Sequence, residues 1–318
     1  MTNKGFFQES AISIEYENGK IETDPLFLAE SFNTHYINIV ENSSGKKPTE
    51  IGDSSNRNKD RETVGEIIQN YKNHPIIVKI SNMFPEFKST FSLKKATAKD
   101  INSIIKSIDS KKAIGPDMIP PKIVKLSVDI IDYHLAYIIN NDIENCAFSD
   151  DAKIACVRPI FKKDVRNKLS NYRPVSILNV FSKVYERYIH ENLTQHVNKI
   201  LSKFISAYRK QYSTNHVLKR LIEEWKIWID NKKCVGSVLM DLSKAFDSIP
   251  HDLLIAKMEA YGFSKDFVTF IYSYLKRRKQ NVKINNCYSS YKVLLSGVPQ
   301  GSIVGPILFN IYINDLFF

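Results

Sequence analysis

An aspartate ends a short apolar run, at a place where its type and position could support chemistry. The run CVGSVLMD, residues 234–241, has the composition of a buried strand. A carboxylate at the end of such a strand is costly unless a cation or hydrogen bonds offset its charge. Magnesium prefers carboxylate oxygens, and a strand end would hold them rigidly beside a phosphate. Asp241 is therefore a candidate metal ligand for phosphoryl transfer, with a structural cap as the alternative.

A second segment with a constrained backbone begins 55 residues after Asp241, as SGVPQGSIVGPILFNIYINDL. In this segment Gly297 and Gly301 flank Pro299-Gln300, and glycines allow the backbone to approach a ligand closely. A PQG sequence on its own is typical of an ordinary turn. This one is extended by a long apolar segment, which favours a loop with a defined position.

The charge of the chain is concentrated in one region. The 318 residues carry a net charge of +11, and residues 151–220 alone hold 15 Lys and Arg against four Asp and Glu, a balance of +11. The same region contains five tyrosines, namely Tyr172, Tyr185, Tyr188, Tyr208 and Tyr212. Basic and aromatic side chains together favour a surface that binds a polyanion, and a merely solvated basic surface is the alternative.

The elements that must position these residues are mainly helices, with a few strands. Asp24 and the Thr97/Asp100 pair are typical helix caps, and polar residues 41–62 resemble a loosely held linker. The helix that begins after Thr97 should end near Ala113, because Gly115-Pro116 forces a turn. Spacing and turn residues predict further helices at 121–145, 181–193, 250–262 and from 305, a helix carrying the basic run 276–279, a strand pair within 153–164, and a hairpin turning at 285–286.

Some classes of protein are disfavoured. No run of 18 or more apolar residues and no basic-then-apolar start is present, so we expect neither membrane insertion nor secretion. The expected location is therefore intracellular, in the nucleus or the cytoplasm. The four cysteines are scattered, which argues against a zinc site and against a disulfide framework.

Several segments resemble one family. VLMDLSKAFDSIPHDLL and SGVPQGSIVGPILFNIYINDL resemble motifs A and B of the reverse transcriptases of non-LTR retrotransposons, especially the jockey-like elements of animals. Upstream, in the same order, KKAIGPDMIPPKIVK resembles the segment that opens the domain, VRPIFKKDVRNKLSNYRPVSILNVFSKVYERYI resembles the fingers motifs, and ISAYRKQYSTNHVL resembles the next block. NGKIETDPLFLAESFN resembles the linker that usually follows the endonuclease of the element.

The resemblance implies an α+β fold that comprises the fingers and a partial palm of a right-hand polymerase, with the thumb absent. Residues 1–95 would form an N-terminal linker or extension with one helix and a disordered polar stretch. Residues 96–230 would form the fingers, and residues 231–318 the part of the palm that carries motifs A and B.

Carried over by position, the resemblance makes Asp241 the catalytic carboxylate. Together with the carbonyl of Leu242 it would bind the two Mg²⁺ ions of the complete enzyme, one activating the primer 3′-hydroxyl and the other stabilising the pyrophosphate. Phe246 would lie under the sugar ring and exclude a 2′-hydroxyl, with a core phenylalanine as the alternative. Asp247 should point to the opposite face and cap a helix.

The resemblance also implies residues that bind the nucleotide. Lys162 or Lys163, with Lys162 favoured, and Arg173 would hold the triphosphate of a deoxynucleoside triphosphate, because an Arg fork binds phosphate oxygens in pairs. Gln300 and Gly301 would contact the incoming nucleotide and the template region.

Basic residues outside the site would bind the RNA template and the DNA primer. Arg209 and Lys210, and Arg277 and Arg278 in the run 276–279, are expected to contact the nucleic-acid backbone. Solvated helix charge is the alternative for the second pair. The sequence indicates no oligomeric state.

The family pattern also includes an aromatic-x-Asp-Asp motif on a hairpin after motif B, whereas the sequence ends INDLFF. We therefore expect a chain that is truncated after motif B and inactive alone, because one carboxylate cannot hold two magnesium ions. Phe148-Ser149-Asp150-Asp151 has the letters of that motif, but it precedes Asp241. Asp315 should lie on a helix beyond the Gln300 loop.

Two other interpretations remain. One is a non-catalytic remnant that binds nucleic acid through the basic fingers surface. The other is an enzyme of the group II intron or retron type, which would share motifs A and B. The GPDMIP block and the wording SKAFDSIPHDLL are closer to animal retrotransposons.

Overall fold

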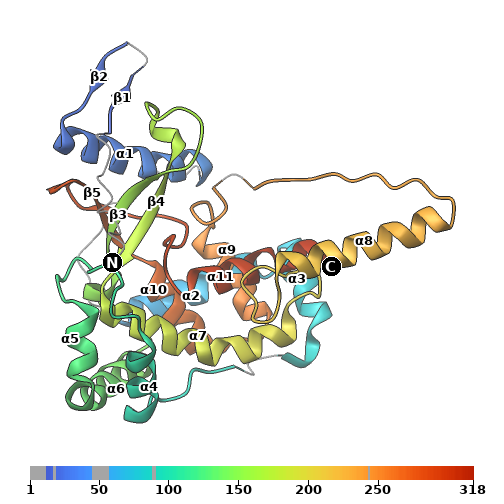
Figure 1. The fold of residues 1–318 in the computed structure, drawn as a ribbon. Coiled ribbons are helices and arrows are strands. Elements are labelled where there is room, and N and C mark those ends of the chain that lie inside the picture. The colour runs from blue at the N-terminus through green and yellow to red at the C-terminus, as the bar shows by residue number, and fades with distance from the viewer. Residues whose placement is uncertain (1–11, 17–18, 45–56, 88–90, 243) are drawn as a thin grey trace, which may run out of the picture.

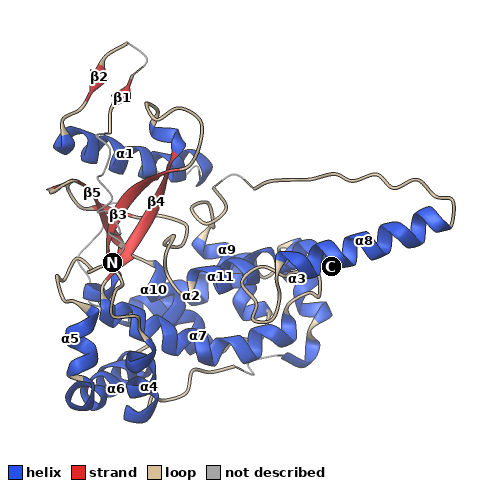
Figure 2. Ribbon diagram, viewed as in Figure 1, coloured by secondary structure: helices blue, strands red, loops and turns tan. Residues whose placement is uncertain are grey.

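The computed structural model describes residues 12–16, 19–44, 57–87, 91–242 and 244–318. Helices surround a five-stranded sheet (Figures 1 and 2), and this mixture agrees with the predicted α+β class. The α-helices are α1 (Pro25–Ser44), α2 (Arg57–Tyr71), α3 (Pro75–Met83), α4 (Ala98–Ser107), α5 (Pro121–Leu126), α6 (Val128–Glu144), α7 (Val180–Ile200), α8 (Thr214–Asp230), α9 (His251–Ala260), α10 (Lys265–Leu275) and α11 (Gly305–Ile313). The strands are β1 (Ile14–Glu15), β2 (Ile21–Glu22), β3 (Ile154–Phe161), β4 (Tyr172–Leu178), β5 (Lys279–Ile284), β6 (Cys287–Tyr288) and β7 (Lys292–Val293).

The sheet has the order β4-β3-β5-β6, and β7 also pairs with β5. Strand β3 is antiparallel to β4 and parallel to β5. Helix α1 lies across one face of the sheet, where Phe32 packs on Val157, Tyr172 and Val282 in a small apolar core. The ring centroids of Phe32 and Tyr172 are 5.1 Å apart. The N-terminal helix is thus part of the body that carries the sheet.

The caps predicted from the sequence are confirmed. Asp24 accepts a hydrogen bond from the backbone N–H of Phe27 at 2.7 Å, and Thr97 and Asp100 form the reciprocal capping box of α4. The predicted end of α4 near Ala113 is wrong, because the helix ends at Ser107 and the next residue has extended backbone.

Other helix predictions need correction as well. The expected helix at 121–145 is two helices, broken at Ser127, whose hydroxyl donates to the carbonyl of Ile123 and competes with the backbone pattern. The basic run 276–279 follows α10 rather than lying on it. The region 153–164 holds one strand, β3, and its antiparallel partner β4 lies outside this region. The predicted hairpin at 285–286 is confirmed, with Asn285 at a φ of 52°.

Residues 45–56 of the predicted polar linker lie outside the described residues, and α2 begins at Arg57, inside the same stretch. Helices α2, α9 and α10 pack together, and α7 and α11 complete the main apolar core. Helices α4, α5 and α6 form a lobe that packs on α7 through α4. Among the described residues, no helix combines the length and the apolar character that crossing a membrane requires.

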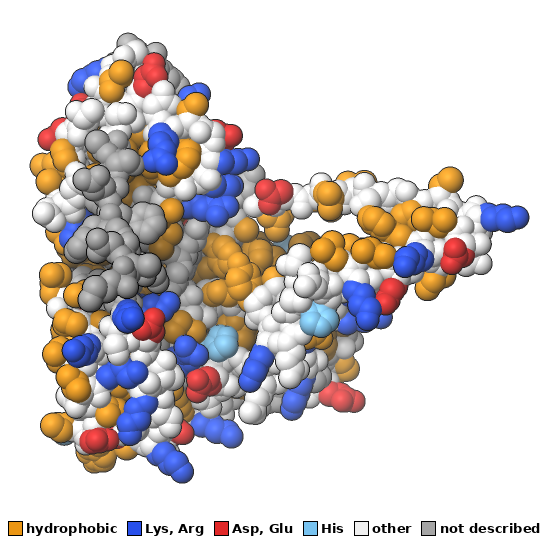
Figure 3. Space-filling model, in the orientation of Figure 1, with side chains coloured by type: hydrophobic (Ala, Val, Ile, Leu, Met, Phe, Trp, Pro, Cys, Tyr) orange, Lys and Arg blue, Asp and Glu red, His pale blue; other side chains and the backbone are white. Residues whose placement is uncertain are grey.

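Helix α8 and residues 231–242 form an arm that extends away from the body (Figure 1). Helix α8 buries no residue, and the apolar side chains along it, Leu218, Ile222 and Trp225, are exposed. Figure 3 shows hydrophobic side chains along both parts of the arm, helix α8 and residues 231–242.

The prediction of a buried strand at 234–241 is wrong. Val238, Leu239 and Met240 are 85%, 95% and 90% exposed, and residues 234–242 have no secondary structure. A strand forms only where its backbone N–H and C=O groups meet those of a neighbouring strand. None of the described strands pairs with this segment, so its apolar composition alone does not make it a strand.

A buried asparagine joins α1 to the sheet. The amide of Asn33 donates to the Ser289 hydroxyl at 3.0 Å and to the Ser290 carbonyl at 2.8 Å, and its oxygen accepts from Gln280 at 3.1 Å. We expect Asn33→Ala to lower the free energy of unfolding by about 1–3 kcal/mol, because it leaves buried polar groups unpaired. Urea denaturation measures this loss. Asn38→Ala, at an exposed position of the same helix, is the matched control, and an equal effect of both changes would contradict the assignment.

Candidate nucleotide-binding site

Backbone hydrogen bonds join the end of motif A to the start of motif B. The N–H of Val298 donates to the carbonyl of Phe246 at 2.8 Å, and the N–H of Gly297 donates to the carbonyl of Ile249 at 2.9 Å. Gly297 has a φ of +77°, and a Cβ atom there would lie 2.6 Å from the carbonyl oxygen of Asp247. Only glycine allows both this backbone conformation and this approach.

The side chains of Asp247 and Gln300 continue the same contact. The amide of Gln300 donates to the carboxylate of Asp247 at 2.7 Å. Burial raises the pKa of Asp247, and the hydrogen bond from Gln300 and the charge of Lys244 partly oppose that rise. The prediction that Asp247 caps a helix is wrong, because the N-cap of α9 is Pro250.

The loop then crosses the free edge of β4. The N–H of Ser176 donates to the carbonyl of Gln300 at 2.8 Å. A Cβ atom on Gly301 would lie 2.5 Å from the carbonyl oxygen of Ser176, and the φ of Gly301 is +126°. The loop is therefore seated on the strand that also carries Arg173.

The β3–β4 hairpin brings the predicted phosphate-binding cations together. Arg173 pairs with Ile160, and the N–H of Lys162 donates to the carbonyl of Asn171 at 2.8 Å, which extends the same register. Residues that pair across two strands project from the same face of the sheet, and successive residues along a strand project from alternate faces. The alternation, extended to Lys162 by this hydrogen bond, places Lys162 on the face of Arg173, whereas Lys163 lies in the bend that follows the strand. Both Lys162 and Arg173 are exposed.

Phe246 lies in an aromatic cluster at the side of the loop. Its ring centroid is 4.9 Å from that of Phe309 on α11 and 5.8 Å from that of Tyr208. Phe246 is half-buried, so its ring is held in place while part of it remains accessible.

Asp241 and Leu242 lie apart from this set of contacts. Both are exposed in the part of the arm that follows α8, residues 231–242. Within the described chain no hydrogen bond joins Asp241 to the Gln300 loop. Among the described residues no group of three or more His, Cys, Asp or Glu side chains could hold a metal ion. The role of Asp241 as a metal ligand therefore stays a prediction.

Other aspartates that could be mistaken for catalytic ones have structural partners. Asp150 forms an ion pair with the buried Lys153 at 2.7 Å. Asp315 is buried against Lys257, whose ammonium also donates to the carbonyl of Tyr312 at 2.7 Å.

The predicted nucleic-acid contacts separate into two groups. Arg278 is 1% exposed, and its guanidinium lies 4.7 Å from the ring centroid of Tyr274, so the prediction that it contacts nucleic acid is wrong in this conformation. Arg277 is half-buried, and Lys210 is exposed. Arg209 donates to the carbonyls of Ser202 and Ile205 and therefore also fixes the fold of its own loop.

Glu186 on α7, which the sequence analysis did not single out, is hydrogen-bonded to the motif B loop. The fully buried carboxylate of Glu186 on α7 accepts from the hydroxyl of Tyr274 at 2.8 Å and from the N–H of Ile303 at 2.6 Å. Burial raises its pKa, and the charge of Arg278 opposes that rise. Ser182, Glu186, Ile189 and Leu193, all buried, recur at helical spacing, so an acidic residue on an apolar helix face was the available signal.

Comparisons with known proteins identify the family of the chain. The family model described as "Reverse transcriptase (RNA-dependent DNA polymerase)" matches residues 160–318, half of the chain. The chain is 32% identical over 228 residues to the probable RNA-directed DNA polymerase from transposon BS of Drosophila melanogaster, covering 70% of this chain and 25% of that protein. It is 28% identical over 233 residues to the RNA-directed DNA polymerase from mobile element jockey of the same organism, covering 72% and 25%.

A match to an intron-encoded protein is shorter. The putative COX1/OXI3 intron 2 protein of Saccharomyces cerevisiae (strain ATCC 204508 / S288c) is 28% identical over 158 residues, covering 50% of this chain and 17% of that protein. The chain belongs to the reverse transcriptase family, which implies the right-hand polymerase fold, and its relatives include the polymerases of jockey and other non-LTR elements. It spans about a quarter of the length of those relatives.

The contact at Gly297 gives a first prediction for the site. Gly297→Ala should destabilise the protein by at least about 2 kcal/mol, because the methyl group meets backbone atoms and the φ is unfavourable for alanine. Gly236→Ala is the matched control, because nothing lies within 4 Å of a Cβ atom there. Thermal unfolding of both variants checks this, and a Gly297→Ala variant as stable as its control would refute the close approach.

The Asp247–Gln300 hydrogen bond gives a second prediction. Removing the donor with Gln300→Met should raise the pKa of Asp247 further, because the bond favours the charged carboxylate. Stability from a carboxyl whose folded pKa is raised is fully present below the ordinary value of 3.8 and is lost as pH rises through the folded pKa. In the variant this loss should therefore extend to higher pH. A carboxyl ¹³C titration measures the shift, and an unchanged or lower pKa would contradict it.

Proposed function

We propose that this site binds the incoming deoxynucleoside triphosphate in RNA-directed DNA synthesis. The observation that carries the proposal is the seating of the Gln300 loop on the edge of β4, which brings motif B beside the strand of Arg173 and fastens it to Asp247. A loop bearing glycines next to exposed cations suits a ligand with a triphosphate and a flat base.

Each side chain of the site has a proposed role. Arg173 and Lys162 would hold the triphosphate from one face of the β3–β4 hairpin, since an Arg fork and a Lys point charge both suit phosphate oxygens. Gln300 and Gly301 would contact the nucleotide and the template. Phe246 would lie under the sugar, and its packing on Phe309 would make the ring a firm barrier to a 2′-hydroxyl.

We also propose a division into parts. Residues 96–230 would be the fingers and residues 231–318 part of the palm, and no thumb is assigned within the chain. Residues 1–95 would be an extension in front of the fingers, with α1 fastened to the sheet through Asn33. A polymerase of this kind would act where its RNA template meets DNA, in the nucleus or the cytoplasm.

The donor set among the described residues does not fit two magnesium ions. Reverse transcriptases generally use divalent metal, and Asp241 with the Leu242 carbonyl would supply one carboxylate and one carbonyl. The carboxylates of Asp150, Asp247 and Asp315 are engaged by Lys153, Gln300 and Lys257. We therefore propose that residues 1–318 alone bind a primer and template without extending the primer.

The basic region 151–220 would bind the RNA template and DNA primer through their phosphates. A non-catalytic remnant would use the same surface. The matches to jockey and transposon BS span 70% or more of this chain and the intron match spans half, so we favour a non-LTR polymerase over an intron-encoded one.

A binding experiment distinguishes a polymerase site that binds a nucleotide from a non-catalytic remnant that binds only nucleic acid. Residues 1–318 should bind a fluorescent DNA primer annealed to an RNA template, with an affinity that falls as salt rises. The complementary deoxynucleoside triphosphate should slow dissociation of the duplex by about tenfold, as an added set of phosphate contacts would. Arg173→Ala and Lys162→Ala should lose this effect, whereas Lys163→Ala, in the bend beyond the strand, should keep it.

Two outcomes would contradict the proposal. Tight duplex binding with no response to the complementary nucleotide, or an equal response to a mismatched one, would favour the remnant. Primer extension by residues 1–318 that Asp241→Ala abolishes would refute the proposed lack of activity.

A further inference from the structure

The loop that joins β3 to β4, residues 162–171, carries Lys162 and is strongly basic. Its first seven residues hold one acidic residue, Asp164, and four cations, which are Lys162, Lys163, Arg166 and Lys168. All five of these residues are exposed. Like charges that lie close together repel one another, so the loop needs an anchor if it is to keep Lys162 in one place.

Hydrogen bonds from the start of β4 hold one side of this loop. The N–H of Lys162 donates to the carbonyl of Asn171 at 2.8 Å, and the amide of Asn171 donates to the carbonyl of Val165 at 2.8 Å. The hydroxyl of Tyr172 donates to the carbonyl of Arg166 at 2.7 Å. The next residue, Asn167, is held from a different part of the chain.

The β1–β2 hairpin, near the start of the chain, lies beside the loop at Asn167 (Figure 1). The N–H of Glu15 donates to the carbonyl of Asn167 at 2.8 Å, and the side-chain amide of Asn167 donates to the carboxylate of Glu15 at 2.6 Å. Two bonds between the same two residues fix the orientation of the contact as well as its distance. The carboxylate of Glu15 also places a negative charge beside the basic loop.

The hairpin is itself anchored in the body of the protein. Ile14 is 1% exposed and belongs to the small apolar core that includes Phe32 on α1 and Val157 on β3. The hydroxyl of Tyr16 donates to the hydroxyl of Ser31 on α1 at 2.8 Å. The hairpin therefore connects the loop to α1 and to the sheet.

We propose that Ile14, Glu15 and Asn167 are positioning residues of the nucleotide site, which hold the loop so that Lys162 faces the triphosphate beside Arg173. This inference rests on the proposed function of the site. A nucleotide binds only the molecules in which the loop is in place, so a loosened loop lowers its apparent affinity. The N-terminal hairpin is then a part of the site and not a linker in front of it.

Limited proteolysis tests the anchor without any nucleotide. Trypsin cleaves after Lys and Arg, and an anchored loop resists cleavage because it must open first. Ile14→Ala removes the buried contact and should speed cleavage within residues 162–168 by about fivefold. Ile21→Ala, on the same hairpin but at a position that is 64% exposed, is the matched control and should leave the rate unchanged.

The nucleotide response tests the positioning role. Residues 1–318, bound to a fluorescent primer–template duplex, are titrated with the complementary deoxynucleoside triphosphate until dissociation of the duplex slows. Glu15→Ala and Asn167→Ala should each raise the concentration for half of this effect by about threefold. The double variant should raise it no further, because both changes remove the same contact. Duplex affinity without nucleotide should change by less than about twofold, because phosphate contacts are spread over the basic region.

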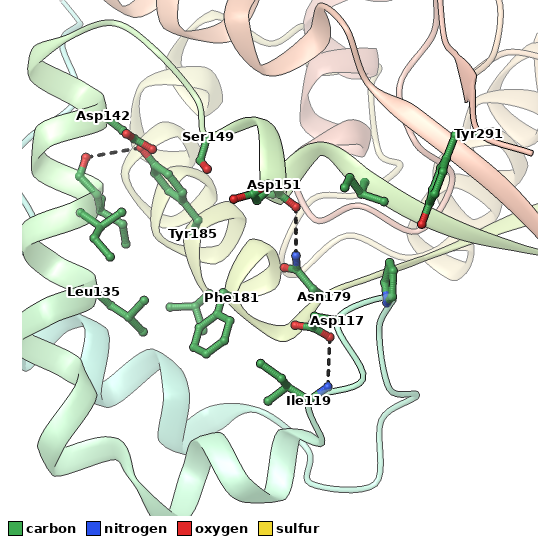
Figure 4. Close-up of a pocket in the computed structure, with 16 residues that line it drawn as sticks. Asp117, Ile119, Leu135, Asp142, Ser149, Asp151, Asn179, Phe181, Tyr185 and Tyr291 are labelled. Carbon is green, nitrogen blue, oxygen red and sulfur yellow. Dashed lines mark hydrogen bonds between the residues drawn. The ribbon is translucent and has the colours of Figure 1, made fainter.

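A variant that is destabilised elsewhere separates positioning from a general loss of stability. Leu135 on α6 lines a cavity of about 540 Å³ between α6 and α7 (Figure 4), on a part of the molecule distant from the loop (Figure 1). Leu135→Ala should lower the Tm of the protein, because it enlarges this cavity. It should change neither the nucleotide response nor the cleavage of the loop.

Three results would overturn the positioning role alone. They are loop cleavage as slow in Ile14→Ala as in Ile21→Ala, additive effects of Glu15→Ala and Asn167→Ala on the nucleotide response, and a loss of that response in Leu135→Ala as large as in Asn167→Ala. A wild-type protein that shows no nucleotide response, with a loop that Ile14 still protects from trypsin, would instead overturn the proposed function and the positioning role with it. Glu15→Ala and Asn167→Ala keep the test decisive if Ile14→Ala does not fold.

Discussion

The close approach of two backbone segments at Gly297 sets the geometry of the candidate site. Segments that are some 50 residues apart in sequence meet there through backbone hydrogen bonds, and a single Cβ atom would prevent the contact. The positions of Phe246, Asp247 and Gln300 all follow from this contact. Because Gln300 also accepts from β4, the same contact determines how motif B faces Arg173.

The loop is held from a second side by a buried charge. Glu186 accepts from the loop amide of Ile303 and from Tyr274 in a dry interior, where an unpaired carboxylate would be costly. Arg278 lies over Tyr274 and supplies the opposing charge. The motif B loop is therefore fixed between the backbone contact at Gly297 and helix α7. This double attachment makes the site a preformed one, as ligand sites usually are.

Local features of the fold could be predicted from the sequence, and features that depend on distant partners could not. The caps at Asp24 and Thr97 and the hairpin turn at Asn285 depend on neighbouring residues, and the structure has them. The segment 234–241 has a strand composition, but strand formation depends on a pairing partner elsewhere in space. Its apolar residues are exposed in this structure, which no local pattern indicates.

The same distinction applies to the site. Gly297, Gly301 and Gln300 could be identified because they lie in one of several segments that resemble the motifs of a known family and occur in the same order. The prediction for Arg278 fails because a basic run does not reveal which of its members is buried against an aromatic ring. Glu186 was missed because its importance depends on the amide of Ile303, 117 residues later in the chain.

Photo-crosslinking is the most direct measurement of where the nucleotide binds. Residues 1–318 would be irradiated with 4-thio-dTTP in the presence of a DNA primer annealed to an RNA template, and the crosslinked peptides would be mapped by mass spectrometry. The geometry predicts crosslinks within 160–176 and 296–302, and competition by unmodified dTTP. Crosslinks confined to the α4–α6 lobe or to the arm would contradict a nucleotide site at the Gln300 loop.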